Sequence, residues 1–285
     1  MRRVGIVTDS TACIPAELAA EHRIEVVPVH LAFGDRLFRE GLDMTARDFY
    51  DMLRTAREPP TTAAPAPGLY ANAILRAGEQ AGAILCITVS RQFSAMYDAA
   101  VQGAAIARER SPGTEILVLD SEAAAMAQGF LALEAARASA EGAPLHVAAD
   151  RARALMPRVQ LLVLLDTLTY LARSGRVPRL LVWAASPLRV KPLVQYQKGK
   201  YRPIAVVRSI ERGMERLIEA LRQRAGGGAL HVCVHHTYAP ERAELLAARV
   251  RDVLAPQELF TAEFTQVMGV HTGPGLLGFA FYTEP

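Results

Sequence analysis

The chain has 285 residues, of which 51% are hydrophobic and 21% are charged, and its formal net charge is +3. This length allows two domains of ordinary size, and the hydrophobic content excludes an intrinsically disordered chain. The small net charge excludes a strongly basic nucleic-acid-binding protein unless the basic residues are gathered in one patch.

The first half of the chain alternates extended and helical patterns. An apolar run from Val4 ends in Asp9, Ser10 and Thr11, at the carboxyl end of a predicted strand, where open α/β sheets bind ligands. The same residue types also cap helices, so both roles stay open. The other predicted elements are a helix from Pro15, an extended run 26–33, an irregular stretch 34–44, a helix 45–57, a proline-rich loop, a helix 69–81, a strand 83–89, a helix to 110, a strand 115–119, and helices 122–141 and 144–156. This alternation predicts a parallel, doubly wound sheet in residues 1–157.

In residues 158–285 a predicted β-hairpin interrupts the alternation of strands and helices. Lys198-Gly199-Lys200 separates two extended runs, which is a typical hairpin signal. The predicted elements are a strand 159–165, a helical turn 166–172, a helix 178–185, strands 190–197 and 201–207, a helix 209–224, a strand 231–235, a helix 240–254, and strands 258–265 and 276–283. We therefore expect an α+β domain with a mixed sheet.

Three polar positions are candidates for a binding site. Thr62 precedes a proline-rich turn, Ser94 stands at the start of a predicted helix, and His271 and Thr272 lie in a predicted glycine-rich turn before the last strand. Each has a structural explanation, because Thr and Ser commonly cap helices and a single histidine is more often structural than functional.

In combination, these segments resemble the DegV family of fatty-acid-binding proteins, the carrier subunits of bacterial fatty acid kinase. The resemblance covers essentially the whole chain. It is carried by Val7-Thr-Asp-Ser-Thr, Thr62-Ala-Ala-Pro-Ala-Pro-Gly, Ile87-Thr-Val-Ser-Arg-Gln-Phe-Ser-Ala-Met-Tyr, Asp120-Ser, Leu168-Thr-Tyr-Leu-Ala-Arg-Ser-Gly-Arg, Leu188-Arg-Val-Lys-Pro, Val207-Arg-Ser and Gly269-Val-His-Thr-Gly-Pro-Gly.

The resemblance implies a larger α/β/α domain that buries the acyl chain and a smaller two-layer α+β domain that completes the head-group site. It places the carboxyl ligands at Thr62 and Ser94, with His271 in their hydrogen-bond network. It places Arg176 near the same site. From their positions in the sequence, Thr272 and Gly273 in the glycine-rich turn and Asp9 and Ser10 after the first strand are further supporting candidates. The family pattern differs here at Ala63, Ala66 and Met96, where the family has hydroxyl-bearing residues.

The implied ligand is a long-chain fatty acid such as palmitate, with no cofactor and no metal. The implied partner is a kinase subunit similar to dihydroxyacetone kinases, which would phosphorylate the carboxyl group for phospholipid metabolism. Burial of an acyl chain contributes about 0.8 kcal/mol per methylene group. Neutral hydroxyl and imidazole donors hold a carboxyl group less tightly than an arginine fork would, as a carrier requires.

The protein is expected to be cytoplasmic. Its three cysteines, Cys13, Cys86 and Cys233, are far apart, which is typical of a reducing compartment, and no metal-site spacing is present. Asp9 interrupts the first apolar run, so we expect no signal peptide. No uncharged run reaches the roughly 18 residues of a membrane span.

Three other functions remain as alternatives. An esterase could use Ser94, His271 and Asp9 as a triad, although the chain has no Gly-x-Ser-x-Gly motif. A dinucleotide-binding dehydrogenase would need a Gly-x-Gly-x-x-Gly loop after the first strand, which is absent. Residues 173–208 carry basic but no acidic side chains, which suggests a DNA-binding regulator, a solvated face, or a docking face for the kinase or for anionic membranes. DNA binding is disfavoured because no recognition helix is found.

Overall fold

A computed structural model describes residues 2–56, 58–174 and 190–284. Contacts group the chain into two units, one made of Met1–His30 and Ala63–Arg158, the other of Leu31–Thr62 and Val159–Pro285. Residues 31–62 therefore group with the C-terminal part, whereas the sequence pattern predicts a single boundary after residue 157. Arg176 and the predicted helix 178–185 lie outside the described residues. Within the described parts, no helix is both long and apolar enough to cross a membrane.

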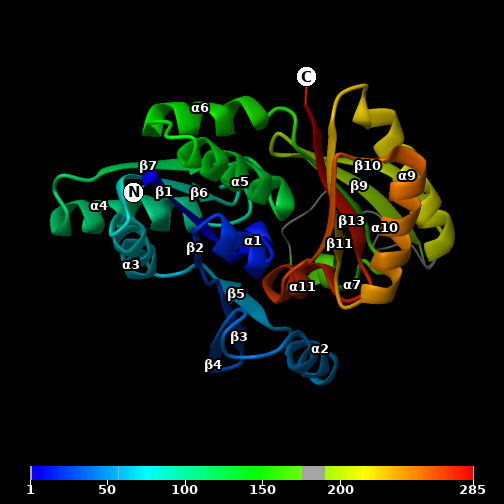
Figure 1. The fold of residues 1–285 in the computed structure, drawn as a ribbon. Helices are drawn as coiled ribbons and strands as arrows, with labels where there is room; N and C mark the ends of the chain where they lie inside the picture. The colour runs from blue at the N-terminus through cyan, green and yellow to red at the C-terminus, as the bar shows by residue number, and fades with distance from the viewer. Residues whose placement is uncertain (1, 57, 175–189, 285) are drawn as a thin grey trace. The chain divides into compact units, whose positions relative to one another are not determined.

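The first unit contains a parallel sheet, as predicted, with four strands in the order β2-β1-β6-β7 (Figure 1). Its strands are β1 (Arg2–Asp9), β2 (Ile24–Val27), β6 (Ala81–Thr88) and β7 (Glu115–Asp120). Its helices are η1 (Ser10–Ala12), α1 (Ala16–Glu21), α3 (Pro67–Gly78), α4 (Met96–Arg110), α5 (Met126–Ala140) and α6 (Leu145–Leu155). In Figure 1, α3 and α4 pack together on one face of the sheet, and α5 and α6 pack together on the other. This arrangement buries both faces, which is why β6 reads as a continuous apolar run.

The predicted alanine-rich helix 122–141 begins four residues later than expected, at Met126. Alanine favours a helix, but the preceding residues take part in tertiary hydrogen bonds. The Ser90 amide donates to the Ala123 carbonyl at 3.0 Å, and the Ser121 hydroxyl accepts from the Ala123 amide at 3.1 Å. These contacts hold the segment as a loop beside the end of β6.

The second unit contains a six-stranded mixed sheet in the order β10-β9-β8-β13-β11-β12, which confirms the predicted sheet type. Only β11 and β12 are parallel neighbours; the other pairs are antiparallel. Its strands are β8 (Gln160–Leu164), β9 (Lys191–Gln197), β10 (Lys200–Val207), β11 (Leu230–His236), β12 (Glu258–Glu263) and β13 (Leu277–Thr283). Its helices are α7 (Thr169–Ser174), α9 (Ile210–Ala225), α10 (Pro240–Leu254) and α11 (Gln266–Thr272). The α9 and α10 helices share a buried apolar core with the sheet.

The predicted hairpin joins β9 to β10 through Lys198 and Gly199, which both have positive φ angles, of 49° and 67°. Two central residues with positive φ are typical of the tight turn whose twist matches a β-hairpin. Ser209 caps α9 by accepting the Arg212 amide at 3.3 Å, so the helix begins close to the predicted position.

A separate three-stranded sheet, in the order β4-β3-β5, lies mainly within residues 31–62. Its strands are β3 (His30–Phe33), β4 (Arg36–Arg39) and β5 (Thr61–Ala63), and helix α2 (Ala46–Thr55) follows β4. Two predictions are corrected here. The extended run predicted over residues 26–33 is divided between β2 and β3, which belong to different sheets, because Pro28 has no amide hydrogen to donate to a neighbouring strand. The stretch 34–44, predicted to be irregular, contains β4. The capping box of Thr45 and Asp48 begins α2 close to the predicted position.

His235, on β11 of the second unit, is fully buried. The ring of His235 packs edge-on against Phe264, with 5.2 Å between ring centroids, and its Nδ1 is 3.1 Å from the Ala262 carbonyl oxygen. Because a carbonyl only accepts hydrogen bonds, Nδ1 carries the proton of a neutral ring. Burial lowers the pKa of His235 from 6.5 to about 3.

We expect His235 to weaken the fold in acid. Between pH 6.5 and 3 the unfolded chain binds a proton at this position and the folded protein does not, so the free energy of unfolding falls as the pH decreases. The contribution is about 1.4 kcal/mol per pH unit. Urea unfolding of His235→Gln between pH 7 and 4.5 should show a shallower pH dependence. The exposed His146→Gln serves as control, and equal slopes for wild type and His235→Gln would contradict this account.

Candidate functional site

Two of the predicted head-group residues meet within the second unit. The Thr62 hydroxyl in β5 lies 3.2 Å from His271 Nε2, although 209 residues separate them in the chain. Both side chains are half-buried. The expected glycine-rich turn around His271 is corrected: His271 and Thr272 form the last turn of α11, and the turn begins at Gly273. The structure therefore places a hydroxyl on β5 and an imidazole on α11 side by side.

The glycines around His271 are required by close packing. A Cβ atom at Gly269 would lie 2.5 Å from the Tyr50 hydroxyl oxygen, and one at Gly273 would lie 2.2 Å from Tyr170 Cδ2. Gly273 also has a φ angle of +71°, which residues with side chains rarely adopt. The motif thus lets Tyr50 and Tyr170 pack directly on the backbone of α11 and its following turn.

Thr237, which belongs to none of the sequence motifs above, holds the turn after α11 through hydrogen bonds. Its buried hydroxyl donates to the Gly273 carbonyl at 2.7 Å and accepts from the Leu276 amide at 2.8 Å. Its carbonyl accepts the Gly275 amide at 2.7 Å. A threonine that follows a strand carries no local signal of such a role, because the partners are almost forty residues away.

A cavity of about 170 Å³ opens beside the Thr62–His271 pair. Its lining residues are Leu53, Ala56, Pro59, Pro60, Thr61, Thr62, Tyr170, Arg173, Val270 and His271. Five lining residues are apolar, and the other five carry polar groups: the side chains of Thr61, Thr62, Tyr170, Arg173 and His271. Tyr170 and Arg173, both on α7, were missed as lining residues because their proximity to His271 arises only from tertiary packing. Such a cavity suits a small polar group attached to an apolar body.

Ser94, the third predicted head-group residue, belongs to the first unit. It is half-buried in the loop after β6, and α4 begins two residues later, with Ala95 at the N-cap. Ser94 is therefore not the N-cap residue of α4, contrary to the structural explanation given above. Its role in a head-group site remains a prediction.

Asp9 and Ser10 make structural contacts within the first unit. The Asp9 carboxylate is fully buried and accepts the Val89 amide at 3.0 Å and the Gln128 side-chain amide at 3.2 Å. It also accepts the Thr11 amide at 3.1 Å, which caps η1. Burial raises the pKa of Asp9 above its usual range, while these donors oppose the increase. Ser10 accepts the Val29 amide at 3.1 Å.

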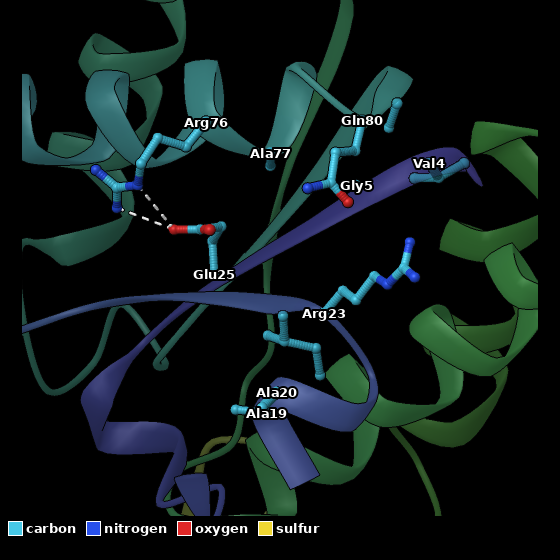
Figure 2. A pocket seen from close by; sticks show the side chains of 11 residues that line it. Val4, Gly5, Ala19, Ala20, Arg23, Glu25, Arg76, Ala77 and Gln80 are labelled. Carbon is cyan, nitrogen blue, oxygen red and sulfur yellow. Dashed lines mark hydrogen bonds and ion pairs between the residues drawn. The ribbon is translucent and has the colours of Figure 1, made fainter. Parts of the chain in front are cut away.

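A second cavity, of about 430 Å³, lies in the first unit at the amino ends of β1, β2 and β6. Figure 2 shows Arg23, Gln80 and the ion pair of Arg76 with Glu25 around it; the ion-pair distance is 2.9 Å. Open α/β sheets bind ligands at the carboxyl ends of their strands, so this position is not the one expected for a head-group site.

The remaining predicted site features are placed as follows. Arg176 lies outside the described residues. The Thr272 hydroxyl donates to the Met268 carbonyl at 3.0 Å, within its own helix. Lys191, from the basic stretch 173–208, is paired with Asp166, whereas Lys198 and Lys200 are exposed. Across the residues that the structure describes, no cluster of His, Cys, Asp and Glu could hold a metal ion.

Comparison with known proteins identifies relatives along the whole chain. The profile of the family described as "Uncharacterised protein, DegV family" matches residues 3–284. A DegV domain-containing protein of Streptomyces coelicolor is 38% identical over 279 residues, which are 97% of each chain. Two solved structures, each 26% identical with a TM-score of 0.87 over 100% of both chains, are described as a fatty-acid-binding DegV family protein from Thermus thermophilus and as DegV, a fatty acid binding protein from Bacillus subtilis.

Proposed function

This chain belongs to the DegV family, and we propose that it binds a long-chain fatty acid, such as palmitate, and presents the carboxyl group to a partner kinase. The observation that carries the proposal is the Thr62–His271 pair beside a partly apolar cavity. The fatty-acid binding described for the Thermus thermophilus and Bacillus subtilis proteins supports the choice of ligand.

The chemistry of the pair favours one arrangement of protons. If His271 Nε2 carries the hydrogen, it donates to the Thr62 oxygen, and the Thr62 hydroxyl hydrogen remains available for a carboxylate. If Nε2 lacks the hydrogen, Thr62 donates to His271 and has no donor left for the ligand. A proton on Nε2 therefore makes Thr62 a hydrogen-bond donor to the head group.

Ser94 is proposed as a second hydroxyl donor, and Arg176 as a residue needed for coupling to the kinase, as the family resemblance implies. Asp9 and Ser10 support the loops at the carboxyl end of β1. Thr272 and Gly273 shape the end of α11. Hydroxyl and imidazole donors would bind the carboxyl group while leaving its oxygen atoms reactive toward a phosphoryl donor.

Catalysis is assigned to the partner, which is a kinase subunit similar to dihydroxyacetone kinases. This chain contains no Gly-x-x-x-x-Gly-Lys-Ser/Thr loop for nucleotide phosphates. The exposed Lys198 and Lys200 would contribute to docking on the kinase or to transient contact with anionic lipid. The carrier would thereby supply acyl groups for phospholipid synthesis in the cytoplasm.

The esterase alternative needs a Ser94–His271–Asp9 triad. The Asp9 carboxylate instead accepts hydrogen bonds from Thr11, Val89 and Gln128 within its own unit. These bonds occupy the oxygens that would have to orient the imidazole of a triad. Hydrolysis of p-nitrophenyl palmitate that is abolished by Ser94→Ala would favour the esterase.

The proposal is tested by titrating the delipidated protein with palmitate and with its methyl ester. A protein that recognises the carboxyl group should bind palmitate more tightly, because only the free acid becomes a charged acceptor for Thr62. The expected preference is at least about tenfold. Equal affinity for the acid and the ester, or no binding of either, would refute the head-group site.

A further inference from the structure

Helix α11, which carries His271, has an unusual cap at its first turn. Thr265 occupies the N-cap position but makes no side-chain capping hydrogen bond. Instead, the Val267 amide donates to the Glu40 carboxylate at 2.5 Å. Glu40 follows β4, lies 227 residues away in the chain and is only 4% exposed. A buried carboxylate at this point satisfies an amide that the helix cannot pair and interacts favourably with the helix dipole.

Glu40 belongs to residues 31–62, which also contact the rest of α11; we call these residues the clamp segment. Phe49 and Tyr50, on α2, lie against the backbone of the helix at Gly269, where an added Cβ atom would be 3.1 and 2.5 Å from their side chains. Thr62 contacts His271 in the last turn. The clamp segment therefore contacts the first, middle and last parts of a seven-residue helix.

A helix this short has little stability of its own, because its nucleation is not offset by enough internal hydrogen bonds. The position of α11 therefore depends on its contacts with the surrounding residues. The aromatic contacts at Gly269 are packing contacts, which are less directional than a hydrogen bond. The directional bond from Val267 to Glu40 restricts rotation of α11 about its axis, and such rotation would move His271 Nε2 relative to the Thr62 hydroxyl.

We propose that Glu40 is a positioning residue that sets the orientation of His271, and thereby the affinity of the site for the carboxyl head group. The predicted effect of Glu40 on the affinity for fatty acid rests on the proposed function, whereas its effect on the orientation of His271 does not. Glu40 itself acts through α11 and does not contact the ligand.

The experiment compares Glu40→Gln and Glu40→Ala with Asp35→Asn, which removes an exposed carboxylate from the same clamp segment. Glu40→Gln keeps an acceptor of the same size but loses its charge, and we expect about a fivefold loss of palmitate affinity. Glu40→Ala should lose more. Neither variant should change the affinity for methyl palmitate, and Asp35→Asn should behave as wild type. A general loss of structure would lower both affinities equally and would overturn the proposal.

A double-mutant cycle with His271→Ala separates positioning from an independent contribution. If Glu40 acts through His271, Glu40→Gln should cause little further loss of palmitate affinity in the His271→Ala background. Additive losses would overturn the proposal.

The ring signals of His271 in the ligand-free protein provide a readout that does not require fatty acid. In histidine-labelled protein, Glu40→Gln should shift the His271 signals and leave those of His146, in the other unit, unchanged. Unchanged His271 signals would refute the positioning role even if palmitate binds. If palmitate does not bind to the wild type, the proposed function fails, and these signals still decide the role of Glu40.

Discussion

The double substitution Thr62→Val and Ser94→Ala should lower the affinity for palmitate by about 100-fold, the largest functional effect that we expect. Each change removes one of the two hydroxyl groups that we propose as donors to the carboxylate, and a hydrogen bond to a charged group contributes about 1.5–3 kcal/mol. Valine keeps the shape of threonine, so the loss should come from the missing hydroxyl group. Isothermal titration of delipidated proteins with palmitate measures the effect.

Each single variant should lose about tenfold, which tests the two hydroxyl groups separately. Thr61→Val is the matched control, because Thr61 is the exposed neighbour of Thr62 and lines the same cavity. It should retain nearly wild-type affinity. If Thr61→Val weakens binding and Thr62→Val does not, the assignment of the head-group ligand is wrong. If Ser94→Ala has no effect, Ser94 is not a ligand of the carboxyl group.

Replacing Gly273 with alanine should produce the largest loss of stability, about 3 kcal/mol. The φ angle of +71° is unfavourable for alanine, and the new methyl group would lie 2.2 Å from the Tyr170 ring. The ring would have to move, and Tyr170 lines the cavity beside His271. Urea denaturation gives the change in unfolding free energy, and palmitate titration should show weaker binding of the folded variant.

Gly227→Ala is the control for this substitution. A Cβ atom at Gly227 would meet no atom within 4 Å, so this change should alter stability by less than about 1 kcal/mol. Gly273→Ala and Gly227→Ala with the same unfolding free energy would show that the close contact with Tyr170 does not constrain the turn. In that case the glycine motif would need another explanation.

The sheets were predictable because their signals are local. The apolar run of β6 and the Lys198-Gly199 turn of the hairpin depend on neighbouring residues, and the structure reproduces both. The helix around His271 was not predictable, because Gly269 lowers helix propensity and reads as a turn. Its helical conformation depends on contacts with Glu40 and Tyr50, which are more than 200 residues away.

The residues of the candidate site also fall into those that local sequence predicts and those that depend on tertiary contacts. Thr62 and His271 could be named from motifs, and the structure brings them together. Tyr170, Thr237 and Glu40 could not, since each acts through a partner distant in sequence and has an ordinary local context. The residues that hold a site in place leave weaker local signals than the residues that form it.

Mass spectrometry of the lipid bound to the purified protein tests the central claim most directly. The account predicts that denaturation releases a single long-chain fatty acid per chain, and that the Thr62→Val and Ser94→Ala double variant releases much less. Wild-type protein that contains no fatty acid after purification and takes up none from added palmitate would contradict it.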